Sequence, residues 1–185
     1  MTISASTRPP SNHQSNDCVI AAPFGCLGIT TEMVDGSLML ARICYLPAST
    51  KLKAPGNALA ALVEEQCRAY FADPRAAFEL PLKPQGTAFQ QQVWHAVAQL
   101  QSGERTTYGA IAAHLHSGAR AVGGACGANY FPLVIPCHRV VAKANLGGFM
   151  GQDAPGLYRD IKLWLLNHEA RLIGRPAMLQ NCCIL

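Results

Sequence analysis

Three helices separated by short turns are encoded between residues 87 and 127, and this constrains the fold more than any other feature. Thr87 and Gln90 have the spacing of a capping box, which marks the first turn of a helix. Apolar side chains then recur on one helical face, at Phe89, Val93, Val97 and Leu100. Ser102-Gly103 is expected to end this helix.

Two shorter helices follow. The first begins after Thr107, and its inward residues are expected to be Tyr108, Ile111, Ala112 and Leu115. After a turn at 116–118, the second helix covers 119–127. A helix, a three-residue turn and a second helix form the helix-turn-helix pattern, whose second helix contacts DNA in many proteins.

The second of these helices is rich in glycine, although glycine costs about 0.5–1 kcal/mol relative to alanine inside a helix. Its narrow inward stripe consists of Val122, Ala125 and Cys126. The outward face then carries Arg120 and small residues, so another backbone can approach it closely. Tight packing against a second helix is one interpretation, but an exposed arginine among glycines favours DNA.

The first part of the chain is expected to be a small α/β unit. Residues 18–46 contain apolar runs typical of strands. The runs are separated by turn formers: Gly25, Gly28 and Asp35-Gly36. Asn57 then caps a helix that ends at Asp73-Pro74. The expected inward residues of that helix are Leu59, Leu62, Val63, Cys67 and Tyr70.

Two domains follow from the proline-rich segment LPLKPQG, which has the composition of a linker. The polar first sixteen residues do not resemble a secretory signal, and no apolar run reaches the roughly 18 residues of a membrane span. A cytoplasmic protein is therefore expected, or a nuclear one in a eukaryote. The expected organisation is a disordered tail (1–16), an α/β domain (17–79), a linker (80–86), a C-terminal domain (87–173) and a tail (174–185).

The eight cysteines show neither a disulfide framework nor a zinc pattern. Disulfides are disfavoured because nothing indicates export. Histidine is absent from residues 14–94, and no C-x-x-C pair occurs among Cys18, Cys26, Cys44 and Cys67. These cysteines, and Cys126, are expected to be small buried hydrophobic residues.

The excess positive charge lies in the second part of the chain. Residues 1–84 carry seven basic and seven acidic residues, whereas residues 85–150 carry four basic residues against Glu104 alone. Residues 151–185 carry four basic and three acidic residues. Such a distribution favours a polyanionic partner for the second part, although a solvated surface gives a similar count.

Cys137 and His138 are the candidate reactive pair. A free thiol has a pKa of about 8.5, so a nucleophilic cysteine needs a base or a positive environment, which His138, Arg139 or a helix N-terminus could supply. Neighbouring side chains in a strand point to opposite faces. Either the backbone turns after Pro136, or a water bridges the two groups. From these residues alone, a buried structural cysteine beside a polar histidine is an equal alternative.

Several motifs occur in a fixed order between about residues 87 and 170: FQQQVW (89–94), GERTTYGAIA (103–112), RAVG (120–123), Asn129, IPCHRV (135–140), GGF (147–149) and KLWLLNHE (162–169). Together they resemble the core of the O6-alkylguanine-DNA alkyltransferases, also called methylated-DNA–protein-cysteine methyltransferases. The resemblance implies a small antiparallel, RNase H-like sheet with a helix, followed by a mainly α-helical domain that contains a helix-turn-helix.

The resemblance implies a role for each matched residue. Cys137 corresponds to the alkyl acceptor, His138 to the base that reaches the thiol through a water, and Glu169 to the acid that completes a relay similar to a protease triad. Asn129 corresponds to the hinge residue that braces the cysteine turn, and Tyr108 to the tyrosine that assists the departing guanine. The structural alternatives are a core aromatic for Tyr108 and a solvated helix-end acid for Glu169.

The resemblance also implies a DNA-binding surface and an alkyl pocket. Arg120 corresponds to the arginine that replaces the extruded nucleotide in the base stack; its alternative is a pair with a surface carboxylate. The remaining DNA-binding residues are expected to be Thr107, Ala119, Ala121, Gly123 and Gly124. The expected pocket residues are Tyr108, Val140, Met150 and Gly151. In this family the helix-turn-helix lies in the minor groove and the damaged base is flipped out.

The implied function is DNA repair by irreversible, stoichiometric transfer of an alkyl group, mainly methyl, from O6-alkylguanine to Cys137. O4-alkylthymine is a candidate second substrate. The expected partner is double-stranded DNA that contains the lesion, and the free protein is expected to be a monomer. No metal or other cofactor is implied, and each molecule acts once because the thioether is stable.

The sequence departs from the family pattern at three places. Tyr130 follows Asn129 where proline is usual, and the link 150–160 is longer than usual, with Met150 in place of a small or polar residue. These changes affect the cysteine turn and the pocket. The C-terminal CCIL fits a prenylation motif, but nothing else in the sequence indicates a membrane anchor.

Three rival functions fit parts of the pattern. A non-reactive protein that only marks alkylated guanine would lack the acceptor Cys137. A cysteine hydrolase would use the same Cys–His–Glu set but would turn over. A helix-turn-helix regulator would prefer a fixed sequence, whereas a repair protein binds DNA with little sequence preference and strong salt dependence.

Overall fold

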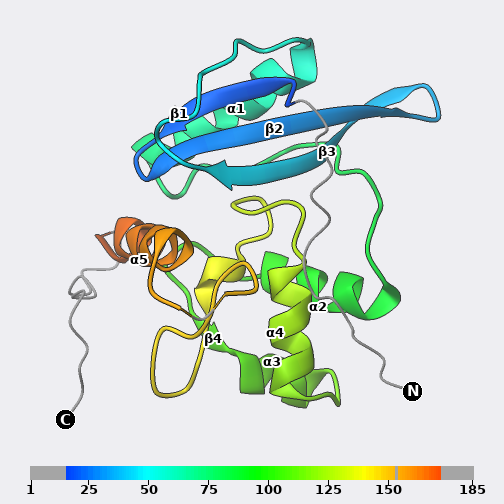
Figure 1. The fold of residues 1–185 in the computed structure, drawn as a ribbon. Coiled ribbons are helices and arrows are strands. Elements are labelled where there is room, and N and C mark those ends of the chain that lie inside the picture. Colours follow the sequence, from blue (N-terminus) through cyan, green and yellow to red (C-terminus); the bar gives the residue numbers. More distant parts are fainter. Residues whose placement is uncertain (1–15, 153, 172–185) are drawn as a thin grey trace, which may run out of the picture.

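The computed structural model describes residues 16–152 and 154–171 (Figure 1). Its N-terminal part is an antiparallel sheet in the order β1-β2-β3 with one helix packed against it: β1 (Cys18–Ala22), β2 (Gly25–Val34), β3 (Ser37–Leu46) and α1 (Ala58–Ala72). Asn57 caps α1 as predicted, because its side chain accepts from the Ala60 backbone N at 2.8 Å. The predicted antiparallel sheet with a helix is confirmed, while its RNase H-like classification stays a prediction.

Two details of the prediction for this part are wrong. Gly28 is not in a turn but lies inside β2, paired with both neighbouring strands. A Cβ at Gly28 would be 2.7 Å from the side chain of Asn16, so the glycine makes room for that side chain. Leu62 is 38% exposed rather than inward, because the buried face of α1 is rotated toward Ala60.

The C-terminal part is mainly helical, as predicted. Its elements are α2 (Ala88–Ala98), β4 (Thr106–Thr107), α3 (Tyr108–His114), α4 (Ala119–Gly127), β5 (Val140–Val141) and α5 (Leu157–Ala170). Thr87 and Gln90 form the capping box of α2. That helix ends at Ala98 rather than at Ser102-Gly103, and the chain turns there toward β4. The parallel pairing of β4 with β5 was not predicted, since each strand has only two residues.

Two connecting segments join the parts. The segment 80–86 runs alongside β3. The backbone N–H of Leu40 donates to the carbonyl of Pro81 at 2.8 Å, and the backbone N–H of Lys83 donates to the carbonyl of Leu40 at 2.9 Å. The segment 128–136 rises from the end of α4 toward the sheet (Figure 1), where Ile43 of β3 donates to the carbonyl of Tyr130 at 2.9 Å. The unusual Tyr130 therefore belongs to the contact between the two parts.

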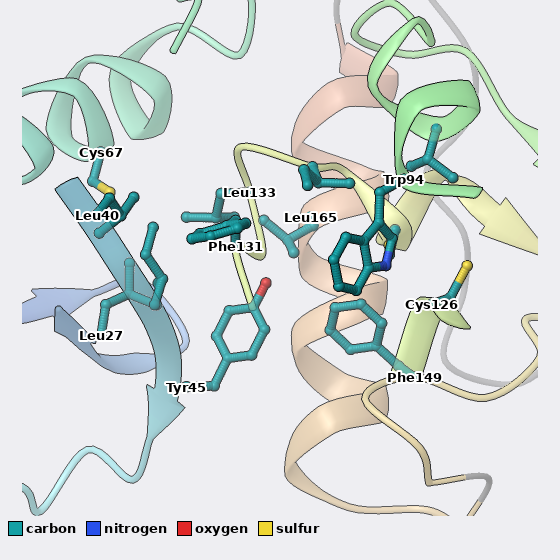
Figure 2. Close-up of a cluster of buried hydrophobic side chains, with 14 of the residues drawn as sticks. Leu27, Leu40, Tyr45, Cys67, Trp94, Cys126, Phe131, Leu133, Phe149 and Leu165 are labelled. Atoms are coloured by element: carbon teal, nitrogen blue, oxygen red, sulfur yellow. The ribbon is translucent and has the colours of Figure 1, made fainter. Parts of the chain in front are cut away.

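The hydrophobic core is continuous across both parts (Figure 2). Phe131 and Leu133, on the segment after α4, lie between the sheet and Leu165 of α5. The segment that leads to Cys137 is thus held from both sides. None of the helices within the described ranges has the length and apolar character of a membrane span. The C-terminal tail with its CCIL motif, and the N-terminal tail except Asn16, lie outside the described residues.

Candidate active site

The backbone turns at the candidate nucleophile. Cys137 opens a short 3-10 turn, η1 (Cys137–Arg139), and its side chain is only 3% exposed. The side-chain amide of Asn129 donates to the carbonyl of Ile135 at 2.8 Å and to the Sγ of Cys137 at 3.3 Å. Asn129 thus touches both the approach to the turn and the sulfur itself, which are the contacts that a bracing residue needs.

His138 is oriented by a carboxylate. Its Nε2 lies 2.9 Å from Oε1 of Glu169, and both side chains are 1% exposed. A carboxylate only accepts hydrogen bonds, so Nε2 of the neutral ring carries the proton and Nδ1 is the basic nitrogen. Nδ1 is buried and has no hydrogen-bond partner in the described part of the chain. Burial lowers the pKa of His138, so the imidazole is neutral and can accept a proton near pH 7.

Glu169 is the centre of a buried hydrogen-bond network. Besides His138, it accepts from the guanidinium of Arg139 at 2.8–3.2 Å, from the hydroxyl of Tyr70 at 2.8 Å and from the backbone N–H of Gly103 at 3.1 Å. Burial alone would raise the pKa of Glu169, but the hydrogen bonds from His138 and Arg139, together with the charge of Arg139, hold it well below its usual range. Glu169 is therefore ionised, and it is not the solvated helix-end acid of the alternative interpretation.

The pKa of Cys137 is raised well above the usual range for a thiol, first by a hydrogen bond with the thiol of Cys126 on α4 and then by burial. The same bond lowers the pKa of Cys126. The Asn129 amide and the Lys162 ammonium act in the opposite direction on Cys137 without outweighing these effects. Cys137 is thus a neutral thiol at rest, and its activation needs a base.

Tyr108, at the start of α3, is half-buried against the GGF segment. Its hydroxyl donates to the carbonyl of Gly148 at 2.9 Å. The ammonium of Lys162, which is fully buried on α5, donates to the same carbonyl and to that of Val140, each at 2.8 Å. A Cβ at Gly147 would lie 2.9 Å from the Tyr108 ring, so this glycine permits the close contact.

The outer face of α4 is bare and adjoins Tyr108. The residues Ala119, Arg120, Ala121 and Gly124 are exposed. Arg120 forms no ion pair within the described residues, which removes its structural alternative there. A Cβ on the half-buried Gly123 would be 4.0 Å from the Tyr108 ring. Thr107 caps α3, with its hydroxyl accepting from Ala110 at 3.1 Å.

The two interpretations of the glycine-rich helix each apply to one face. A Cβ at Gly127 would lie 3.0 Å from the backbone N of Gly151, so this glycine serves close packing inside the protein. A Cβ at Gly124 would meet nothing within 4 Å, so this glycine leaves open space outside.

The four predicted pocket residues occupy different depths. Val140 is fully buried, and Tyr108 is half-buried. Met150 and Gly151 both have positive φ, 51° and 75°, and form the tip of a tight turn closed by mutual backbone bonds between Phe149 and Gln152. This turn lies against α4 through Gly151. No group of three or more His, Cys, Asp or Glu side chains that could hold a metal occurs within residues 16–152 and 154–171.

The chain is similar to a known family of proteins. A family model described as the 6-O-methylguanine DNA methyltransferase DNA-binding domain matches residues 88–171. The constitutive methylated-DNA–protein-cysteine methyltransferase of Bacillus subtilis is 42% identical over 109 residues, which is 57% of this chain and 63% of that protein. The Mycobacterium bovis methylated-DNA–protein-cysteine methyltransferase is 37% identical over 136 residues, 71% of this chain and 82% of the relative.

The chain belongs to the methylated-DNA–protein-cysteine methyltransferase family. The crystal structure of Mycobacterium tuberculosis OGT in complex with DNA is similar over 83% of this chain and 91% of that one, with 32% identity and a TM-score of 0.65. The chain spans only 63% of the length of the Bacillus subtilis relative and 42% of that of a Haemophilus influenzae relative.

Within this methyltransferase fold, three residues of the site had no functional role predicted from the sequence. Lys162 had a usable signal, because Lys162, Leu165, Leu166 and Glu169 follow the i, i+3, i+4, i+7 spacing of one buried helical face. Cys126 was predicted as packing only; it is buried, but its thiol also contacts Cys137. Tyr70 was predicted to face inward, yet no local pattern indicates that it reaches a carboxylate 99 positions away.

Proposed function

We propose that this chain repairs DNA by accepting the alkyl group of O6-alkylguanine on Cys137, once per molecule. The observation that carries the proposal is the buried Nδ1 of His138, which has no hydrogen-bond partner among residues 16–152 and 154–171 and is left as the base by the contact between Nε2 and Glu169. That base belongs to the residue next to a buried thiol. The family membership supports the same chemistry.

The reaction is a displacement at the alkyl carbon. His138 takes the thiol proton through a bridging water, and the Glu169 carboxylate stabilises the resulting imidazolium. The sulfur of Cys137 forms a bond to the alkyl carbon while the bond from that carbon to O6 breaks, and the electron pair passes to guanine. Overall, the thiol proton ends on guanine and nothing is oxidised or reduced.

Tyr108 assists the leaving group. Guanine departs poorly unless its developing negative charge is protonated or hydrogen-bonded, and a phenol at the site can donate to it. In the free protein this hydroxyl donates a hydrogen bond to the Gly148 carbonyl, so it must exchange that partner for the guanine. Lys162 holds the same carbonyl and keeps the GGF segment in place during the exchange.

Duplex DNA that contains the lesion is the proposed partner, with α3 and α4 acting as a helix-turn-helix in the minor groove. The bare outer face of α4 around Gly124 supports a close approach to the DNA backbone. The exposed Arg120 fills the space left by the flipped nucleotide, which offsets part of the cost of unstacking. Binding of this kind depends on phosphate contacts and therefore weakens steeply as salt rises.

The test is the intact mass of the protein after incubation with a duplex that carries one O6-methylguanine. We expect one added methyl group per chain, located by peptide mapping on Cys137 rather than on Cys126. Cys137→Ser abolishes the gain, whereas Cys67→Ala, which removes a buried thiol on α1, retains it. An unmodified wild-type protein refutes the proposal. Processing of more than one lesion per chain favours a cysteine hydrolase.

A further inference from the structure

A tyrosine from the N-terminal part reaches the carboxylate of the site. Tyr70, on α1, is 1% exposed, and its hydroxyl donates to Oε1 of Glu169 at 2.8 Å. The same oxygen lies 2.9 Å from Nε2 of His138. The guanidinium of Arg139 also donates to this oxygen, at 2.8 Å and 3.2 Å. The phenol, the imidazole and the guanidinium therefore share one oxygen, and each weakens the interaction of that oxygen with the others.

The Tyr70 hydroxyl is held in place and stays a donor. The backbone carbonyl of Tyr70 pairs with Nε2 of His168, the residue before Glu169, at 2.8 Å, so the two helices α1 and α5 are joined at both ends of this residue. Burial raises the pKa of Tyr70 well above its usual range, and the charge of Glu169 raises it further. A phenol in these surroundings keeps its proton at neutral pH and stays a hydrogen-bond donor.

We propose that Tyr70 is a positioning residue that sets the basicity of His138 by sharing Oε1 of Glu169, so that the N-terminal α/β part tunes the alkyl-transfer site. This inference rests on the proposed function for its consequence in the reaction. The hydrogen-bond sharing itself can be tested in the free protein, without any transfer.

Removal of the Tyr70 hydroxyl is expected to change the pKa of His138 in one direction. Without the Tyr70 donor, Oε1 of Glu169 interacts more strongly with His138, which favours the charged imidazolium and raises the pKa of His138. The other charges that act on His138 are those of Arg139, in the same turn, and Lys162, on α5, and both lower its pKa. In the variant Arg139 keeps its hydrogen bonds to Oε1 of Glu169, and Lys162 keeps those to the carbonyls of Val140 and Gly148, so both charges remain.

The experiment compares Tyr70→Phe with Tyr45→Phe. Tyr45 is also a buried tyrosine of the N-terminal part, but its hydroxyl has no hydrogen-bond partner among the described residues, so its loss leaves the carboxylate unchanged. The first readout is the titration of His138, followed by NMR in the free protein. The second is the rate of single-turnover methyl transfer from about pH 5 to about pH 9, a range that brackets the ordinary histidine pKa.

We expect Tyr70→Phe to move the His138 titration and the acidic limb of the rate profile to higher pH. On that limb the rate falls about two- to tenfold below wild type, the scale of one shared hydrogen bond to a charged group. Tyr45→Phe leaves both curves in place. Glu169 keeps Arg139, His138 and Gly103 as donors in Tyr70→Phe, so the variant is expected to fold.

A second variant keeps the hydrogen bond and is expected to shift the His138 titration in the opposite direction. Tyr70 replaced by 3-fluorotyrosine is a more acidic phenol and a stronger donor, so the His138 titration moves to lower pH. An unchanged titration in both Tyr70 variants overturns the proposal, as does a shift of equal size in Tyr45→Phe. Absence of methyl transfer by the wild-type protein refutes the proposed function, while the titration still decides the role of Tyr70.

Discussion

Glu169→Gln is expected to cost more stability than any other single polar substitution in the site. The change keeps the size of the side chain but removes the charge that accepts hydrogen bonds from Arg139, His138, Tyr70 and Gly103 at 2.8–3.2 Å. Arg139 and Glu169 have side chains only 9% and 1% exposed, so water screens their interaction little. The glutamine would leave a guanidinium buried without its counter-charge.

The magnitude follows from that unpaired charge. Removing one partner of a buried ion pair costs about 3–5 kcal/mol, because the other charge stays desolvated. A domain has about 5–15 kcal/mol of total stability, so the variant is expected to lose a large share of it. By contrast, Glu64→Gln removes an i,i+4 pair with Arg68, whose side chain is 64% exposed, and is expected to cost at most about 0.5 kcal/mol.

The stability lost in Glu169→Gln depends on pH, and the direction of that dependence follows from the pKa of Glu169. The folded-state pKa of Glu169 is held below its unfolded value of about 4.3, so the stabilisation is fully present above that pH and is lost as the pH falls through the folded-state pKa. Glu169→Gln lacks this titration. The difference between wild type and variant in the free energy of unfolding should therefore shrink in acid.

Urea unfolding at about pH 7 and about pH 3 measures both effects, with Glu64→Gln as the matched control. We expect a large loss at neutral pH and a smaller difference in acid. If Glu169→Gln costs no more than Glu64→Gln at pH 7, the buried network does not stabilise the fold in the way described, and the argument is refuted.

Three further predictions concern the helix α4. Arg120→Ala should leave the melting temperature unchanged, because the side chain is exposed. It should slow methyl transfer from duplex DNA but not from the free modified base. Equal slowing on both substrates would contradict insertion of Arg120 into the base stack. Gly124→Ala should stabilise the protein by about 0.5–1 kcal/mol in thermal unfolding yet weaken DNA binding in a gel-shift titration, and unchanged binding would argue against this face as the DNA contact. Cys126→Ala should lower the pKa of Cys137, seen as faster alkylation of the Cys137 peptide by iodoacetamide near neutral pH; an unaltered rate would show that the shared hydrogen bond does not control the thiol.

Local patterns in the sequence were sufficient to predict most helix boundaries. Caps and turns depend on only a few neighbouring residues. The local sequence was therefore enough to predict Asn57 and Thr87 as helix caps and the span 119–127 as a helix. The errors arise where a distant residue decides the outcome. Gly28 lies inside β2, where its missing side chain makes room for that of Asn16, and no pattern around Gly28 contains that information.

The contacts among the predicted site residues could not be derived from the sequence. The resemblance indicated His138 and Glu169, and the structure places them 2.9 Å apart. The roles assigned to them stay predictions until transfer is measured. The additional donors to Glu169 come from α1 and from the segment before β4, far from it in sequence. Such contacts depend on how the two parts pack, which periodicity within one element does not encode.

The two pKa directions at the centre of the site have a common consequence. The thiol of Cys137 has a raised pKa and the imidazole of His138 a lowered one, so both changes oppose proton transfer from sulfur to nitrogen in the free protein. A stable thiolate–imidazolium pair is thus not the resting state. Under the proposed function, the proton leaves as the sulfur attacks, when the bond to the departing guanine begins to break. In the proposed function the thiol is consumed in one reaction, so a resting state that keeps it neutral and 3% exposed limits its loss to other electrophiles.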